Sequence, residues 1–158
     1  MTDEKKQSFT RRITQANRTQ LVVILYEMLL VYLEDAVDAY SNDNKQEFSK
    51  NLNMVRECIK EMRVSLDFAY DISKNLFALY CFADKEVAAD IYGYKTDNLN
   101  VVKMIFTKLH DAYQAVSKKD DSAPLMDNIQ TVYAGITYGR TDVNESFMDN
   151  NERRGFFA

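Results

Sequence analysis

Few side chains in this chain could carry catalysis or bind a metal: one histidine and two cysteines among 158 residues. His110 is alone, so no pair of histidines can hold a metal ion. A lone histidine on a helical bundle is nevertheless the arrangement of histidine phosphotransfer domains, where the imidazole must be exposed and a lysine stabilises the phosphoryl group. Here the acidic Asp111 follows directly, and an acid at this position would repel a phosphoryl group. Phosphotransfer signalling through His110 is kept as the alternative to a function without catalysis.

The sequence lacks the common catalytic and cofactor-binding motifs. It contains no Gly-Lys-Ser/Thr phosphate loop, no G-x-G-x-x-G, no H-E-x-x-H, no C-x-x-C and no G-x-S-x-G. Cys58 and Cys81 fall on different predicted helices, and we interpret them as small buried hydrophobic residues of a protein in a reducing compartment. The sequence predicts a protein that is not an enzyme and that uses no cofactor and no metal.

Length and charge narrow the class of protein further. A chain of 158 residues with only four Gly and one Pro is expected to form one domain. Its net charge of −4 argues against a nucleic-acid partner. No apolar run precedes Leu21, so we expect no cleavable secretory signal, and the run over 21–33 is shorter than the ~18 residues of a membrane span. We therefore expect a cytoplasmic protein without membrane insertion.

Four stretches have the hydrophobic spacing of long helices, and these must position any site. The sequence predicts helices over 19–40, with Thr19 as N-cap, and over 45–69, 72–93 and 98–117. The second is the clearest, because its apolar residues form a heptad seam: Phe48, Leu52, Val55, Ile59, Met62, Leu66 and Ala69. Short connections place successive helices antiparallel. The predicted fold class is all-α, an antiparallel four-helix bundle with a short fifth helix and an extended C-terminal tail.

Both ends of the chain are predicted to lie outside the bundle domain of residues 19–117. Residues 1–18 are polar and rich in basic side chains, which predicts a flexible, exposed N-terminal arm, mobile over residues 1–12. Residues 118–158 comprise a charged linker, a short helix over about 123–134 and a tail. Ser122 would cap the short helix, and Gly135 would end it.

The first predicted helix is apolar on more than one face. One stripe follows Leu21, Leu25 and Met28, but the opposite face is apolar as well: Val22, Val23, Ile24, Leu30 and Val31. Such a helix is either central in its bundle or partly covered by something else. The chain also has ten Tyr and seven Met, which often line a groove for an apolar partner.

Three segments stand in order on the first three predicted helices: Thr19-Gln-Leu-Val-Val-Ile-Leu-Tyr-Glu27, Ile59-Lys-Glu-Met-Arg-Val-Ser-Leu-Asp67 and Asp71-Ile-Ser-Lys-Asn-Leu-Phe-Ala-Leu-Tyr80. In letters, order and spacing they resemble the flagellin export chaperones, the FliS-like family, over residues 13–116. The chain departs from the family pattern at Met28, where the family has Gly, and at Tyr113, where it usually has Trp.

This resemblance implies a cytoplasmic chaperone that binds the C-terminal region of flagellin, prevents premature polymerisation and delivers it to a component of the flagellar type III export gate. The client segment would fold as helices into apolar grooves. An uncovered groove favours self-association, so monomer and homodimer both stay open. The residues that we expect to bind this partner are apolar residues of the first three predicted helices: Val22, Ile24, Leu25, Leu52, Val55, Leu76 and Tyr80.

The C-terminal tail is a candidate competitor for the same groove. Large apolar residues continue beyond Gly135, among them Phe147, Phe156 and Phe157. One hypothesis is that residues 123–158 fold back and occupy the groove while flagellin is absent. The alternatives are a helix packed on the bundle with a disordered end, and a tail that contacts the export gate or another chaperone.

Overall fold

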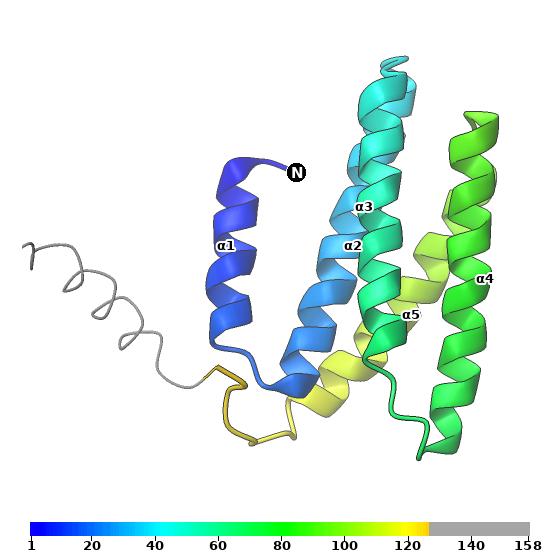
Figure 1. Ribbon diagram of the computed structural model, residues 1–158. Coiled ribbons are helices and arrows are strands. Elements are labelled where there is room, and N and C mark those ends of the chain that lie inside the picture. The colour runs from blue at the N-terminus through cyan, green and yellow to red at the C-terminus, as the bar shows by residue number, and fades with distance from the viewer. Residues whose placement is uncertain (127–158) are drawn as a thin grey trace, which may run out of the picture. The chain divides into compact units, whose positions relative to one another are not determined.

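Helices form all the regular secondary structure of the part of the chain that the structure describes. The computed structural model describes residues 1–126, and its helices are α1 (Asp3–Thr14), α2 (Arg18–Ser41), α3 (Lys45–Val64), α4 (Asp71–Gly93) and α5 (Leu99–Ser117) (Figure 1). No strand occurs in residues 1–126, so the all-α prediction is confirmed. Helices α2 to α5 are the four that the hydrophobic spacing predicts. Within these residues, no helix combines the length and the apolar character needed to cross a membrane.

A core of buried side chains joins α2, α3, α4 and α5. Helices α2, α3 and α4 run side by side, and α5 runs obliquely to them (Figure 1). The heptad seam of α3 is buried from Phe48 to Met62, as its spacing predicts. The other three helices contribute mainly large aliphatic and aromatic side chains to this core: Tyr26, Leu29, Leu33, Tyr80, Val87, Val102 and Phe106. The predicted bundle of long helices therefore forms.

Helix α2 begins earlier than predicted because Asn17, and not Thr19, is its N-cap. The Asn17 side chain accepts a hydrogen bond from the backbone N–H of Gln20 at 2.8 Å. In return the Gln20 side chain accepts from the backbone N–H of Asn17 at 3.0 Å. This reciprocal pair satisfies two N–H groups that have no partner inside the helix and so fixes where α2 starts.

Helix α3 ends at Val64, five residues before its predicted end at 69. The Ser65 hydroxyl donates to the carbonyl of Met62 at 2.9 Å, and Asp67 Oδ1 accepts from the backbone N–H of Ala69 at 2.9 Å. Side-chain hydrogen bonds of this kind compete with helical ones for the same backbone groups. The heptad spacing continues through Ala69, but the polar residues between its apolar positions end the helix.

The N-terminal segment contains a helix that the sequence analysis did not assign. The predicted arm of residues 1–18 forms α1, in which Phe9 is buried against Ala16 and Ile24. Acidic residues in the first turn and basic residues in the last suit the helix dipole. The charge of this segment suggested an arm, whereas Phe9 and Ile13, four residues apart on one helical face, anchor it. Helix α1 belongs to the same compact unit as the bundle.

The segment after α5 is tied to the start of α2. The Asn17 side-chain amide donates to the carbonyls of Asp120 and Ser122 at 3.0 and 3.3 Å. The backbone N–H of Leu125 donates to the carbonyl of Ala16 at 3.0 Å. Residues 123–126 are not helical, although the sequence predicts a short helix from about 123 to 134. The rest of that predicted helix and the tail hypothesis lie outside the described residues.

Two substitutions to alanine should distinguish the contribution of the bundle core to stability from that of the contact between α1 and α2. Leu52→Ala should lower the free energy of unfolding by about 2–5 kcal/mol, because Leu52 is completely buried. Phe9→Ala should cost less global stability, since Phe9 packs only in the smaller cluster under α1. It should instead speed hydrogen exchange of the α1 amides. Urea unfolding and exchange measurements test both. Similar losses of global stability in the two variants would contradict this separation.

Candidate functional site

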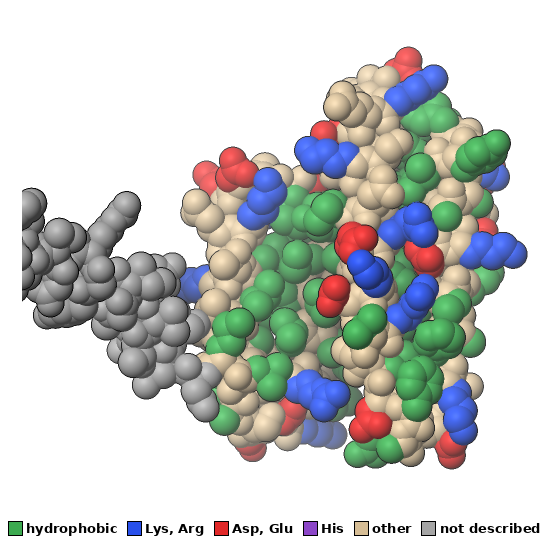
Figure 2. All heavy atoms as spheres, viewed as in Figure 1, with side chains coloured by type: hydrophobic (Ala, Val, Ile, Leu, Met, Phe, Trp, Pro, Cys, Tyr) green, Lys and Arg blue, Asp and Glu red, His purple; other side chains and the backbone are tan. Residues whose placement is uncertain are grey.

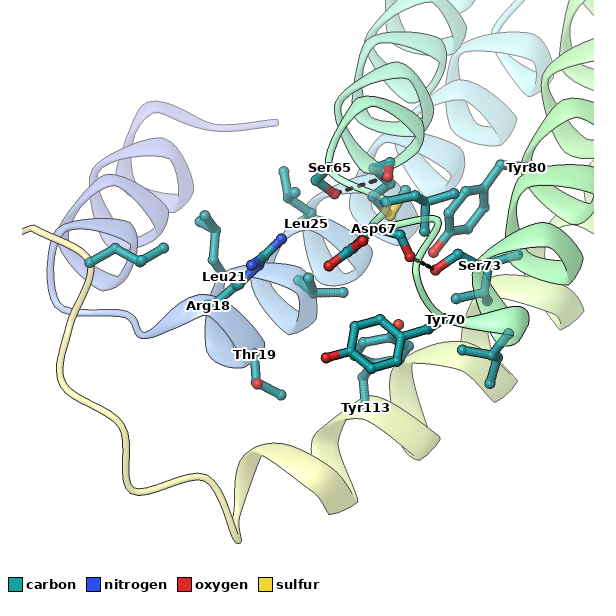
Figure 3. A pocket seen from close by; sticks show the side chains of 16 residues that line it. Arg18, Thr19, Leu21, Leu25, Ser65, Asp67, Tyr70, Ser73, Tyr80 and Tyr113 are labelled. Carbon is teal, nitrogen blue, oxygen red and sulfur yellow. Dashed lines mark hydrogen bonds between the residues drawn. The ribbon is translucent and has the colours of Figure 1, made fainter.

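An apolar pocket lies beside the N-terminal half of α2. Its volume is about 510 Å³, and the α3–α4 connection, the start of α4, α5 and Leu125 surround it (Figure 3). Most of its lining is apolar or aromatic: Leu21, Val22, Leu25, Met62, Leu66, Tyr70, Ile72, Leu76, Tyr80, Tyr113 and Leu125. The charged residues of the lining, Arg18 and Asp67, are solvent-exposed. The pocket therefore suits an apolar ligand with little charge.

The connection between α3 and α4 shapes one side of the pocket. The Ser73 hydroxyl donates to the carbonyl of Asp67 at 2.6 Å, which ties the start of α4 to this connection. Tyr70 and Ile72 follow the turn, line the pocket and are largely exposed. The early end of α3 is thus what brings these apolar side chains to the rim.

Apolar side chains continue over the surface next to this rim. The rings of Phe68 and Phe77 meet edge to face with centroids 5.7 Å apart, and both are exposed. Val64, the last residue of α3, is exposed as well, and the guanidinium of Arg63 lies 5.7 Å from the centre of the Phe77 ring. Figure 2 shows hydrophobic side chains gathered near the ends of α3 and α4 that this connection joins. Apolar surface of this kind marks a place where a partner can dock.

A pair of tyrosines joins the pocket to the core. The hydroxyl of Tyr80, which lines the pocket, lies 2.5 Å from the hydroxyl of the completely buried Tyr26. Tyr80 stacks on Phe106, and Tyr26 packs edge-on against Tyr113. Burial raises the pKa of Tyr80 to about 12, although the hydrogen bond from Tyr26 acts in the opposite direction. Both hydroxyls therefore stay protonated at neutral pH and act as hydrogen-bonding groups.

The structure brings together four of the seven residues that the sequence predicts for partner binding. Val22, Leu25, Leu76 and Tyr80 line the pocket. Ile24 is 3% exposed and packs in the small cluster under α1, away from this pocket.

The remaining two predicted residues have no solvent-accessible surface in this structure. Leu52 and Val55 are completely buried, because the heptad seam of α3 places them in the centre of the bundle. The predicted partner-binding residues did not include other residues of the lining, above all Tyr70, Ile72 and Tyr113. Their only signal was the large number of tyrosines and the polar residues that end α3.

His110 does not have the setting of a phosphoryl acceptor. Its side chain is 17% exposed, and Nε2 is buried without a hydrogen-bond partner, 3.7 Å from Oε1 of Glu27. Burial acts to raise the pKa of Glu27, but the hydrogen bond and charge of Arg12 outweigh it and hold that pKa below its ordinary value. The ionised carboxylate would repel a phosphoryl group at Nε2. In residues 1–126 no cluster of side chains could hold a metal ion.

Comparison with known proteins gives one family. The model of the family described as flagellar protein FliS matches residues 1–120, about three quarters of the chain. This range contains α1 to α5 and nearly all of the pocket. None of the curated proteins compared with the chain matches it.

Because Tyr80 is buried, we expect the free energy of unfolding to fall at alkaline pH. A tyrosine of the unfolded chain ionises near pH 10, whereas Tyr80 in the folded protein has a pKa of about 12. Its contribution to folding is therefore complete below about pH 10 and is lost as the pH rises towards about 12. Urea unfolding at several pH values should show a smaller fall over this range for Tyr80→Phe than for the native protein. Equal decreases in the free energy of unfolding for the two proteins would contradict the attribution of this pH dependence to Tyr80.

Proposed function

The chain belongs to the FliS family of flagellar export chaperones, and we propose that its apolar pocket holds the C-terminal segment of flagellin. In this proposal the bound chaperone prevents premature polymerisation of flagellin in the cytoplasm. The chaperone then delivers flagellin to a component of the flagellar type III export gate. The observation that carries the proposal is an open pocket of about 510 Å³, walled by aliphatic and tyrosine side chains, on a member of this family.

The chemistry of the pocket suits a helical client segment. An amphipathic helix places apolar side chains every three or four residues along one stripe, and these bind a groove between helices. The lining here comes from α2, the α3–α4 connection, α4 and α5, and it continues into exposed Phe68 and Phe77. A segment that is unfolded before binding must gain enough apolar contact to offset the entropy of ordering. A pocket that continues into a surface patch offers such contact.

Four residues are assigned to direct contact with the client: Val22, Leu25, Leu76 and Tyr80, which line the pocket together. Ile24 is covered by α1, so its contact with a client would require α1 to move. Leu52 and Val55 support the site only through the stability of the bundle. This role uses no catalytic residue, and a homodimer formed through the uncovered apolar surface remains compatible with it.

Co-purification with flagellin from the same organism tests the proposed function directly. Full-length flagellin should stay bound to the chaperone at equimolar ratio, and flagellin without its C-terminal segment should not. A truncation at the flagellin N-terminus is the control for non-specific loss of binding. Equal retention of both truncated flagellins would overturn the assignment of the C-terminal segment as the client.

Substitutions within the chaperone should distinguish residues that contact the client from residues that only stabilise the bundle. Leu25→Ala removes a half-buried side chain from the pocket and should weaken binding of a flagellin C-terminal peptide about tenfold or more, while the melting temperature falls by a few degrees. Leu52→Ala should lower the melting temperature more and leave the affinity of the folded protein unchanged. Calorimetric titration below both melting temperatures measures the two affinities. The reverse pattern would place the client elsewhere.

A further inference from the structure

The hydroxyl of Tyr80 lines the apolar pocket, is almost completely buried and, within the described chain, is paired only with the hydroxyl of Tyr26. We propose that the Tyr80 hydroxyl is the polar anchor of the pocket and donates a hydrogen bond to an uncharged oxygen on the client, from the side chain of Asn, Gln, Ser or Thr. The inference rests on the proposed function, since it takes the occupant of the pocket to be the flagellin segment. It makes Tyr80 a specificity-determining residue in a site whose lining is mostly apolar.

The two tyrosine hydroxyls share a single hydrogen bond, so one of their two O–H groups has no acceptor within the described residues. Each hydroxyl has one hydrogen to donate and can also accept. Only one hydrogen can lie between the two oxygens, which are 2.5 Å apart. Among residues 1–126 neither hydroxyl has another hydrogen-bond partner. One hydrogen of the pair is therefore left without an acceptor from the described chain.

Burial decides which hydroxyl keeps the unused hydrogen. Tyr26 is completely buried in the core, where an unused O–H would cost free energy because no water reaches it. Tyr80 is 2% exposed, yet it lines the pocket, and Figure 3 shows its hydroxyl end directed among the other lining side chains. The favourable arrangement has Tyr26 donate to Tyr80. The hydrogen of Tyr80, which lines the pocket, is then the one without an acceptor in the described part of the chain.

The surroundings of Tyr80 select an uncharged acceptor. Next to its ring are Leu76 on the same helix and Phe106, which stacks on it. The charged lining residues, Arg18 and Asp67, are solvent-exposed, so a client carboxylate inside the pocket would lose hydration without a buried counter-charge. The backbone carbonyls of a client helix already accept helical hydrogen bonds. A neutral side-chain oxygen on the pocket-facing stripe is the acceptor that remains.

A double-mutant cycle tests this anchor. The probe is a synthetic peptide of the C-terminal segment of flagellin from the same organism, together with variants in which each Asn, Gln, Ser or Thr is replaced by Ala. Tyr80→Phe should weaken binding of the unmodified peptide about three- to tenfold. One peptide variant should show the same loss with the native chaperone and no further loss with Tyr80→Phe.

Tyr26→Phe is the matched control, because it breaks the same hydrogen bond and leaves the hydroxyl of Tyr80 in place. Its affinity for the unmodified peptide should stay within about twofold of native. Equal weakening by Tyr26→Phe and Tyr80→Phe would show that the loss comes from the broken pair and would overturn the proposal. Additive losses for every peptide variant would overturn it as well. Failure of the native protein to bind the peptide would instead refute the proposed function, and the anchor with it.

Discussion

The structure depends on one constraint: α2 is apolar around most of its circumference, so most of its surface must be covered by other helices. Helices α3 and α5 pack on the face that carries Tyr26, Leu29 and Leu33. Helix α1 covers the face of Ile24 through Phe9. Leu21, Val22 and Leu25, near the start of α2, face the apolar pocket. A helix of this composition cannot lie at the surface of a simple bundle, since its exposed side would leave a large apolar area in water.

The pocket exists because α3 is shorter than its hydrophobic pattern. The seam of apolar positions continues to Ala69, but Ser65 and Asp67 take the backbone out of the helix after Val64. The connection that follows carries Tyr70 and Ile72 to the rim, and the bond from Ser73 to Asp67 holds it against α4. Polar residues at the end of α3 therefore decide where apolar surface is left uncovered.

Hydrophobic spacing was enough to predict the four long helices and the seam from Phe48 to Met62, because periodicity reports directly on which side of a helix is buried. Hydrophobic spacing could not distinguish apolar residues of the core from apolar residues that line the pocket. Leu52 and Leu25 occupy equally good positions in their stripes, yet one lies between helices and the other lines the pocket. Helix α1 was missed because its polar composition hides its two apolar anchors, Phe9 and Ile13. The tyrosine pair was missed because Tyr26 and Tyr80 are 54 residues apart and meet only when the folded bundle brings the side chains of α2 and α4 into the same core.

The most direct measurement of the central claim is an NMR titration of the methyl-labelled chaperone with the flagellin C-terminal peptide. If the apolar pocket holds the client, the methyl signals of Leu21, Leu25, Leu66 and Leu76 should shift together as the peptide is added. The signals of Val37 and Leu99, which line a separate hollow between α2 and α5, should stay in place. Shifts confined to Val37 and Leu99, with the pocket methyls unchanged, would contradict this account.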